Sequence, residues 1–177
     1  LGKTRSSGGD GDPHFDKVSL LLHCDGADGS TALVNSGPTP ITITSDGAAK
    51  ITTAQSRFGG ASLDTTNPSG TYGTAAAPAN TPSLIFGTGD FTVELFVRSS
   101  VSLQTIDYPR LVAVGEYLTS GGWNLVFLKP DGGQLFLDFY ASGGVALGLP
   151  CGTLTDNTWH HVAFARSGTT VRTFLDG

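Results

Sequence analysis

Residues 156–166 read Asp-Asn-Thr-Trp-His-His-Val-Ala-Phe-Ala-Arg, and the chain continues from there to a final Asp-Gly. The pattern predicts a turn, a strand opened by Trp-His-His, a Ser-Gly-Thr-Thr loop and a second strand that ends at the Asp-Gly pair. Successive strand residues point to opposite faces, so His160 and His161 are not expected to bind one metal together. We expect Trp159 to be a large buried anchor on the face of His161, and His161 to hydrogen-bond a neighbouring strand.

Short strand patterns separated by turn signals fill most of the remaining chain. The clearest alternation is Phe91–Arg98, where Phe91, Val93, Leu95 and Val97 share one face. The other expected strands are Val18–Cys24, Ile41–Thr44 and Ala49–Thr53 (a hairpin through Ser45-Asp46-Gly47), a meander of Leu111–Glu116, Trp123–Lys129 and Gln134–Tyr140, and a brief strand at Val145–Leu149. Such a series without an amphipathic helix predicts an all-β sandwich or barrel.

The composition agrees with a β protein that is rich in turns. Of 177 residues, 38% are apolar and only 14% charged, and the chain holds 25 Gly and 9 Pro, which long helices tolerate badly. The length predicts one domain, at residues 13–177, preceded by a flexible linker or the end of a preceding segment at residues 1–12.

The charge and hydropathy patterns exclude two kinds of partner. The net charge is −5 and no Lys/Arg cluster occurs, which argues against nucleic-acid binding. No stretch has the apolar length of a membrane span.

Two cysteines, Cys24 and Cys151, either form one disulfide or remain separate small buried thiols.

Four motifs, in order, resemble the laminin G-like, concanavalin A-like jelly roll domains. They are Leu-Leu-Leu-His-Cys-Asp-Gly at 20–26, Phe-Gly-Gly-Ala-Ser-Leu at 58–63, Gly-Asp-Phe-Thr-Val-Glu-Leu-Phe-Val-Arg at 89–98, and Thr-Trp-His-His-Val-Ala at 158–163 with Leu-Asp-Gly at 175–177. The resemblance implies a two-sheet antiparallel jelly-roll sandwich. The opening segment from Asp12 is particularly similar to versions in tailed-phage structural proteins.

The resemblance implies a non-catalytic carbohydrate-binding or adhesion module, as an accessory domain of a phage virion or tail or of a secreted surface protein. The expected partner is a glycan or host-surface polysaccharide, and the expected location is the virion or the extracellular space. The alternative is a structural virion module that decorates or joins subunits without binding glycan.

The chain departs from the family's pattern after Asp176-Gly177, where the family normally continues with further strands. We therefore expect the sandwich to lack its C-terminal closing strands, and an edge beside Val18–Cys24 to be completed by a missing C-terminal segment or a neighbouring protein chain.

Related jelly rolls often carry a structural calcium ion at the rim of a sheet, held by Asp carboxylates and carbonyls. Asp25, Asp28 and Asp176 are the expected ligands, although Asp-Gly pairs such as these also simply form turns. Lectin-like domains bind sugars with aromatic side chains, and the candidates are Tyr108, Tyr117, Trp123 and Tyr140.

Catalysis is not expected. Glycoside hydrolysis needs two carboxylates flanking one bond, whereas the strand at 91–98 carries Glu94 alone, and the only other Glu is Glu116. A Ser-His-Asp triad is not excluded by counting residues, but no Gly-x-Ser-x-Gly elbow occurs.

Overall fold

The computed structural model describes residues 12–66, 74–77, 81–99, 110–114, 123–128, 134–141 and 144–177. These residues form antiparallel β-sheets with two short 3-10 turns, and none of the helices among them is long and apolar enough to cross a membrane. The all-β fold class is confirmed. The chain divides into two compact units, Leu1–Leu84 and Ile85–Gly177. All of the expected linker at 1–12 except Asp12 lies outside the described residues.

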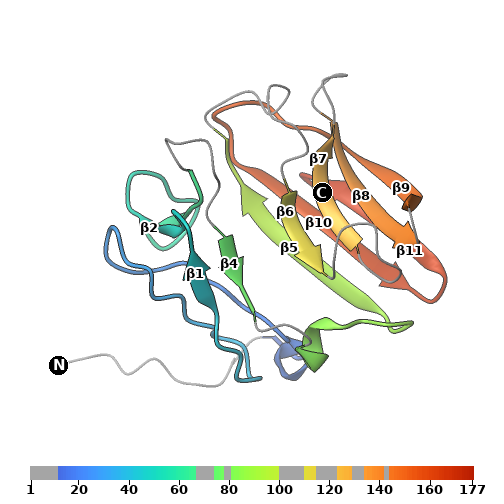
Figure 1. The fold of residues 1–177 in the computed structure, drawn as a ribbon, viewed down its shortest axis with the longest axis horizontal. Helices are drawn as coiled ribbons and strands as arrows, with labels where there is room; N and C mark the ends of the chain where they lie inside the picture. Colours follow the sequence, from blue (N-terminus) through green and yellow to red (C-terminus); the bar gives the residue numbers. More distant parts are fainter. Residues whose placement is uncertain are drawn as a thin grey trace. The chain divides into compact units, whose positions relative to one another are not determined.

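The second unit is a sandwich of two sheets (Figure 1). One sheet has the order β11-β10-β5 and the other the order β6-β7-β8-β9. The bounds are β5 Phe91–Val97, β6 Arg110–Val114, β7 Trp123–Leu128, β8 Gln134–Ala141, β9 Gly144–Thr153, β10 His160–Ser167 and β11 Thr170–Leu175. The expected alternation on β5, the meander of β6, β7 and β8, and the β10–β11 hairpin are confirmed, while β9 is longer than predicted.

The core of this unit lies between the two sheets. Leu135 and Leu137 of β8 and Val162 and Phe164 of β10 are fully buried and form one cluster. The inward residues of β5 pack against this cluster, because β5 pairs with β10 in a register that places Val93 opposite Phe164. Burial of apolar side chains from both sheets is the main favourable contribution to the stability of such a sandwich.

The edge strands β9 and β11 of the two sheets also touch each other. The Cys151 thiol donates to the carbonyl of Phe174 at 3.3 Å, and the Thr173 hydroxyl donates to the carbonyl of Pro150 at 2.8 Å. Gly152 has φ +141°, and a Cβ at this position would lie 2.5 Å from Cδ2 of Leu175. Glycine is therefore required for the close approach of the two strands.

The first unit contains η1 Phe15–Lys17, β1 Thr44–Asp46, β2 Lys50–Thr52, β3 Ser62–Asp64, β4 Thr74–Ala76 and η2 Pro82–Leu84. The expected hairpin of Ile41–Thr44 with Ala49–Thr53 is wrong, since β1 pairs with β4 and β2 pairs with β3. The predicted turn between them is present, with Gly47 at φ +64°.

The expected strand at Val18–Cys24 is also wrong. This segment makes only an isolated bridge between Leu22 and Asn35. The Asn35 side chain accepts the Leu21 amide at 2.9 Å, and Cys24 has φ +54°, which a continuing strand does not allow. Side-chain hydrogen bonding thus replaces the ladder that the apolar run predicted.

Candidate functional site

His160 is clamped between a loop and the end of the chain at the start of β10. Its Nδ1 lies 2.8 Å from Asp176 Oδ2, and its Nε2 lies 3.0 Å from the amide nitrogen of Thr155. A backbone amide can only donate, so Nε2 is the acceptor and the ring proton resides on Nδ1, from which it is donated to Asp176. The residue is only 8% exposed, and both ring nitrogens have partners.

Asp176 reaches this position because its backbone adopts the left-handed conformation, with φ +57°. Aspartate tolerates that region better than most residues. Its Oδ1 accepts the His161 amide at 2.9 Å, while its own amide donates to the His161 carbonyl at 2.9 Å. The hydrogen bond from the His160 side chain, and then that from the His161 backbone, hold the pKa of Asp176 below its usual value of 3.8.

The loop before β10 is fixed from a second side. Asn157 has φ +60°, its amide donates to the Ser99 carbonyl at 2.6 Å, and Arg98 Nη2 donates to its Oδ1 at 3.2 Å. The loop that supplies Thr155 is therefore tied to the end of β5.

The Thr155 hydroxyl lies 3.2 Å from His160 Nε2, so Thr155, His160 and Asp176 have the order of a nucleophile, base and orienting acid. However, Nε2 has one lone pair, and the Thr155 amide already uses it. A general base needs that lone pair to take the hydroxyl proton. The arrangement is therefore structural, and we call Thr155, His160 and Asp176 the clamp. The clamp explains the motif that ends in Asp-Gly.

His161 lies on the opposite side of β10, as predicted. Its Nε2 is 3.2 Å from Glu94 Oε2 on β5, and its ring lies against Phe96, with 4.8 Å between the ring centroids. The expected hydrogen bond to a neighbouring strand is therefore present. Trp159, expected to be a large buried anchor, is only half-buried.

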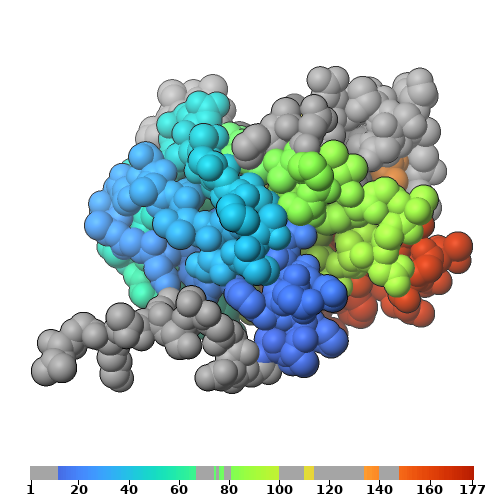
Figure 2. All heavy atoms as spheres, turned by 90° about the horizontal axis from the view of Figure 1, so that it is seen from below, coloured from blue at the N-terminus to red at the C-terminus, as the bar shows by residue number. Residues whose placement is uncertain are grey.

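Glu94, Phe96 and His161 lie on the face of the β5–β10–β11 sheet that points away from the core. We call this face the outer face. Its members alternate with the core residues and are Thr92, Glu94, Phe96, His161, Ala163, Ala165, Thr170, Arg172 and Phe174. Phe96 and Phe174 are 38% and 39% exposed, and the Glu94 side chain is 66% exposed. In Figure 2 the yellow-green spheres of β5 adjoin the red spheres of the C-terminal hairpin.

The outer face was not predicted as a site. The alternation of β5 and β11 shows which residues of each strand share a face of the sheet. Only the pairing of both strands with β10 brings Glu94, Phe96, Arg172 and Phe174 onto one face. Of the aromatic candidates from the sequence, Trp123 and Tyr140 lie in strands of the other sheet.

Of those candidates, Tyr108 and Tyr117 lie outside the described residues. Trp123 is in β7, opposite Phe139 of β8, and Tyr140 is in β8, opposite Val145 of β9. The two positions are thus on adjacent strands, but their side chains are not among those described. Their role in sugar binding stays a prediction.

The expected calcium ligands are engaged in hydrogen bonds or packed against the backbone. Asp28 Oδ1 accepts the Thr53 amide at 2.9 Å, both oxygens of Asp176 accept N–H donors, and the Asp25 carboxylate lies against Gly59. No three His, Cys, Asp or Glu residues in the described segments are gathered so as to hold a metal ion. Calcium binding at Asp25, Asp28 and Asp176 stays a prediction.

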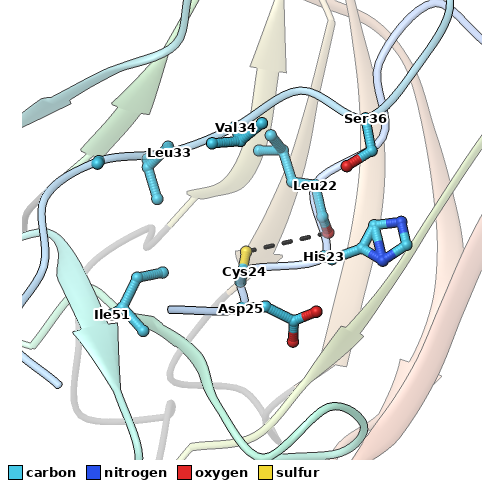
Figure 3. A pocket seen from close by; sticks show the side chains of 9 residues that line it. Leu22, His23, Cys24, Asp25, Leu33, Val34, Ser36 and Ile51 are labelled. Carbon is cyan, nitrogen blue, oxygen red and sulfur yellow. Dashed lines mark hydrogen bonds between the residues drawn. The ribbon is translucent and has the colours of Figure 1, made fainter. Parts of the chain in front are cut away.

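A cavity of about 120 Å³ lies in the first unit, lined in part by Leu22, His23, Cys24, Asp25 and Ile51 (Figure 3). The imidazole of His23 points away from the Cys24 thiol, so these polar side chains do not converge. Both Cys24 and Cys151 are free thiols, and burial raises the pKa of each.

A family model described as the concanavalin A-like lectin/glucanases superfamily matches residues 69–177, more than half of the chain. The chain belongs to this superfamily. The match includes the whole sandwich unit, and with it the clamp and the outer face of this concanavalin A-like domain. No curated protein and no solved structure matches the chain.

Proposed function

We propose that this concanavalin A-like domain is a non-catalytic carbohydrate-binding module, and that it binds glycan on the outer face. The observation that carries the proposal is the cluster of Phe96, His161 and Glu94, in which an exposed aromatic ring lies beside an imidazole and an exposed carboxylate. The superfamily contains lectins, which supports the assignment.

The chemistry of this cluster suits a sugar ring. The C–H groups on one side of a pyranose stack on the negatively polarised face of an aromatic ring. A carboxylate accepts hydrogen bonds from sugar hydroxyls, and such charge-assisted bonds are stronger than neutral ones. Glu94 and His161 hydrogen-bond each other, so both are oriented before a ligand arrives.

The absence of catalysis is part of the proposal. Hydrolysis needs a second carboxylate that can act opposite Glu94. Asp176 is the carboxylate beside His161, and its two oxygens already accept hydrogen bonds from His160 and His161. Among the described residues of the outer face Glu94 is the only acid.

The natural ligand is proposed to be a cell-surface or host-surface polysaccharide, and the domain to act on a virion, in particular a phage tail, or on a secreted protein. A structural calcium ion at Asp25, Asp28 and Asp176 is a separate proposal. Addition of calcium should then raise the unfolding temperature, and a chelator should reverse the rise.

The test is binding to a broad glycan array, followed by calorimetry on each hit. Phe96→Ala should weaken binding about tenfold or more, since loss of one stacking aromatic in a ligand site costs on the order of 1–2 kcal/mol. Phe58→Ala, which removes a 62% exposed ring from the first unit, should leave binding unchanged. If the wild-type chain bound neither the array nor whole cells, the proposal would be rejected and the structural virion module would be favoured.

A further inference from the structure

The two strands that flank β10 on the outer face carry the same pattern of side chains. β5 presents Thr92, Glu94 and Phe96, and β11 presents Thr170, Arg172 and Phe174. Both strands are antiparallel to β10, so they run in the same direction, and each reads Thr, charged residue, Phe along its outer side. The central strand contributes His161, Ala163 and Ala165 between them.

The register fixes how the two patterns face each other. Ala163 lies between Glu94 and Phe174, and Ala165 lies between Thr92 and Arg172. The flanking strands are two strand spacings apart, about 10 Å, and successive outward residues are about 7 Å apart along each strand. Ala163, which is 7% exposed, and Ala165, which is partly exposed, therefore lie in line between two rows of longer side chains, and we call these two alanines the strip.

The two aromatic rings are offset along the strip. Phe174 is level with Ala163, whereas Phe96 is one outward step further, level with His161. A ligand that contacts both rings has to cover the strand spacing as well as the offset, and a single sugar ring does not span both.

We propose that the outer face binds an extended, uncharged glycan chain that lies over β10, with Phe96 and Phe174 against different sugar units of the same chain. The inference rests on the proposed function and adds the class and orientation of its ligand. Glu94 and Arg172 are the hydroxyl-binding groups on opposite sides of the chain.

The charges favour a neutral ligand over an anionic one. Glu94 and Arg172 give the two rows opposite charges, so the face itself has no excess positive charge. An anionic sugar near Arg172 also meets the field of Glu94, and the whole chain carries a net charge of −5. Carboxylate and guanidinium groups can instead accept from and donate to neutral hydroxyls.

The probes are linear neutral glucose, mannose and galactose oligomers from monosaccharide to hexasaccharide, with linear oligogalacturonates of equal length as the anionic series. The affinity for one neutral series should rise at least about tenfold between monosaccharide and tetrasaccharide, as the second aromatic comes into use. The uronates should bind more weakly than that series.

Three variants test where the glycan chain lies on the outer face. Ala165→Trp fills the strip, and Phe174→Ala removes the second ring, so each should reduce tetrasaccharide affinity at least about tenfold while monosaccharide binding at Phe96 changes little. Arg172→Gln removes the charge with little change in size. It should lower the affinity for the neutral oligomers without raising the affinity for the uronates. Lys50→Gln, an exposed charge change in the first unit, is the matched control, and circular dichroism checks that each variant is folded.

The outcomes separate the two proposals. Three results would overturn the inference and leave glycan binding intact. They are an affinity for neutral oligosaccharides that does not depend on their length, tighter binding of the uronates, and tetrasaccharide affinity unchanged in both folded variants Ala165→Trp and Phe174→Ala. Failure of every glycan to bind the wild-type chain would overturn the proposed function and the inference together.

Discussion

The His160 imidazole donates to the Asp176 carboxylate across 2.8 Å, and this hydrogen bond joins the first residue of β10 to the residue that follows β11. The hairpin is thus closed at its open end by side chains, at the point where the strand ladder stops. Its other end is closed by the tight turn at Gly168, which has φ +59°.

Replacement of His160 by Leu should destabilise the fold. The substitution removes the donor to Asp176 and the acceptor for the Thr155 amide from a site that is 8% exposed, and the expected loss is about 1–3 kcal/mol in the free energy of unfolding. Urea denaturation measures it. His161→Leu is the matched control on the outer face, with an expected change within about 0.5 kcal/mol. Equal losses in the two variants would contradict the clamp.

The clamp should also make the fold sensitive to acid. The pKa of Asp176 is lowered below 3.8 in the folded state, chiefly by the hydrogen bond from His160, so the folded carboxylate holds its proton less readily than the unfolded one. Its contribution to stability is therefore present above the unfolded pKa and lost as the pH falls through the lower folded value. Asp176→Asn should be less stable at neutral pH and lose less stability than the wild type between about pH 5 and about pH 2. Parallel pH profiles of the two proteins in urea titrations would rule out this account.

Gly152→Ala tests the contact between β9 and β11. The added Cβ would meet Leu175 Cδ2 at 2.5 Å, whereas a Cβ at Gly168 meets no atom within 4 Å, although φ is positive at both positions. Gly152→Ala should therefore cost about 1–3 kcal/mol more than Gly168→Ala, because only the former crowds a packed side chain. Thermal unfolding of the pair gives the difference, and a larger loss in Gly168→Ala would argue against close packing of these edges.

The core of the sandwich should depend on Phe164 more than on any outward aromatic. Phe164 is fully buried between the sheets, and Phe164→Ala should cost about 3–5 kcal/mol. Phe174→Ala deletes the same ring from a 39% exposed site, and its cost should stay within about 1 kcal/mol. Comparable losses would mean that the outer face is structurally essential, and would weaken its assignment as a ligand surface.

Local patterns predicted the second unit well and the first unit poorly. The alternation of Phe91–Val97 and the turn before Thr170 each depend on residues close in sequence, and these elements form where expected. Val18–Cys24 is as apolar as a strand, but the Asn35 side chain accepts the Leu21 amide and competes with a backbone partner. Nothing local to the segment shows that competition.

The candidate site was missed for a different reason. The candidates from the sequence were tyrosine and tryptophan side chains, whereas Phe96 and Phe174 lie near the ends of β5 and β11 and become neighbours on one face only through β10. Strand periodicity tells which way a residue points, but the order of strands in a sheet depends on long-range pairing. The role of His161 was foreseen in part, since its bond to an adjacent strand follows from alternation.

The alternation of β10 has a consequence for altering the specificity of the domain. His160, Val162 and Phe164 point into the interior, whereas Ala163 and Ala165 form the strip where the ligand is proposed to lie. The side chains that would select among sugars lie on β5 and β11, on the sides of those strands that face away from the core. New sugar preferences can therefore be sought by varying positions 92, 94, 96, 170, 172 and 174 as one library, with β10 and the interior held constant.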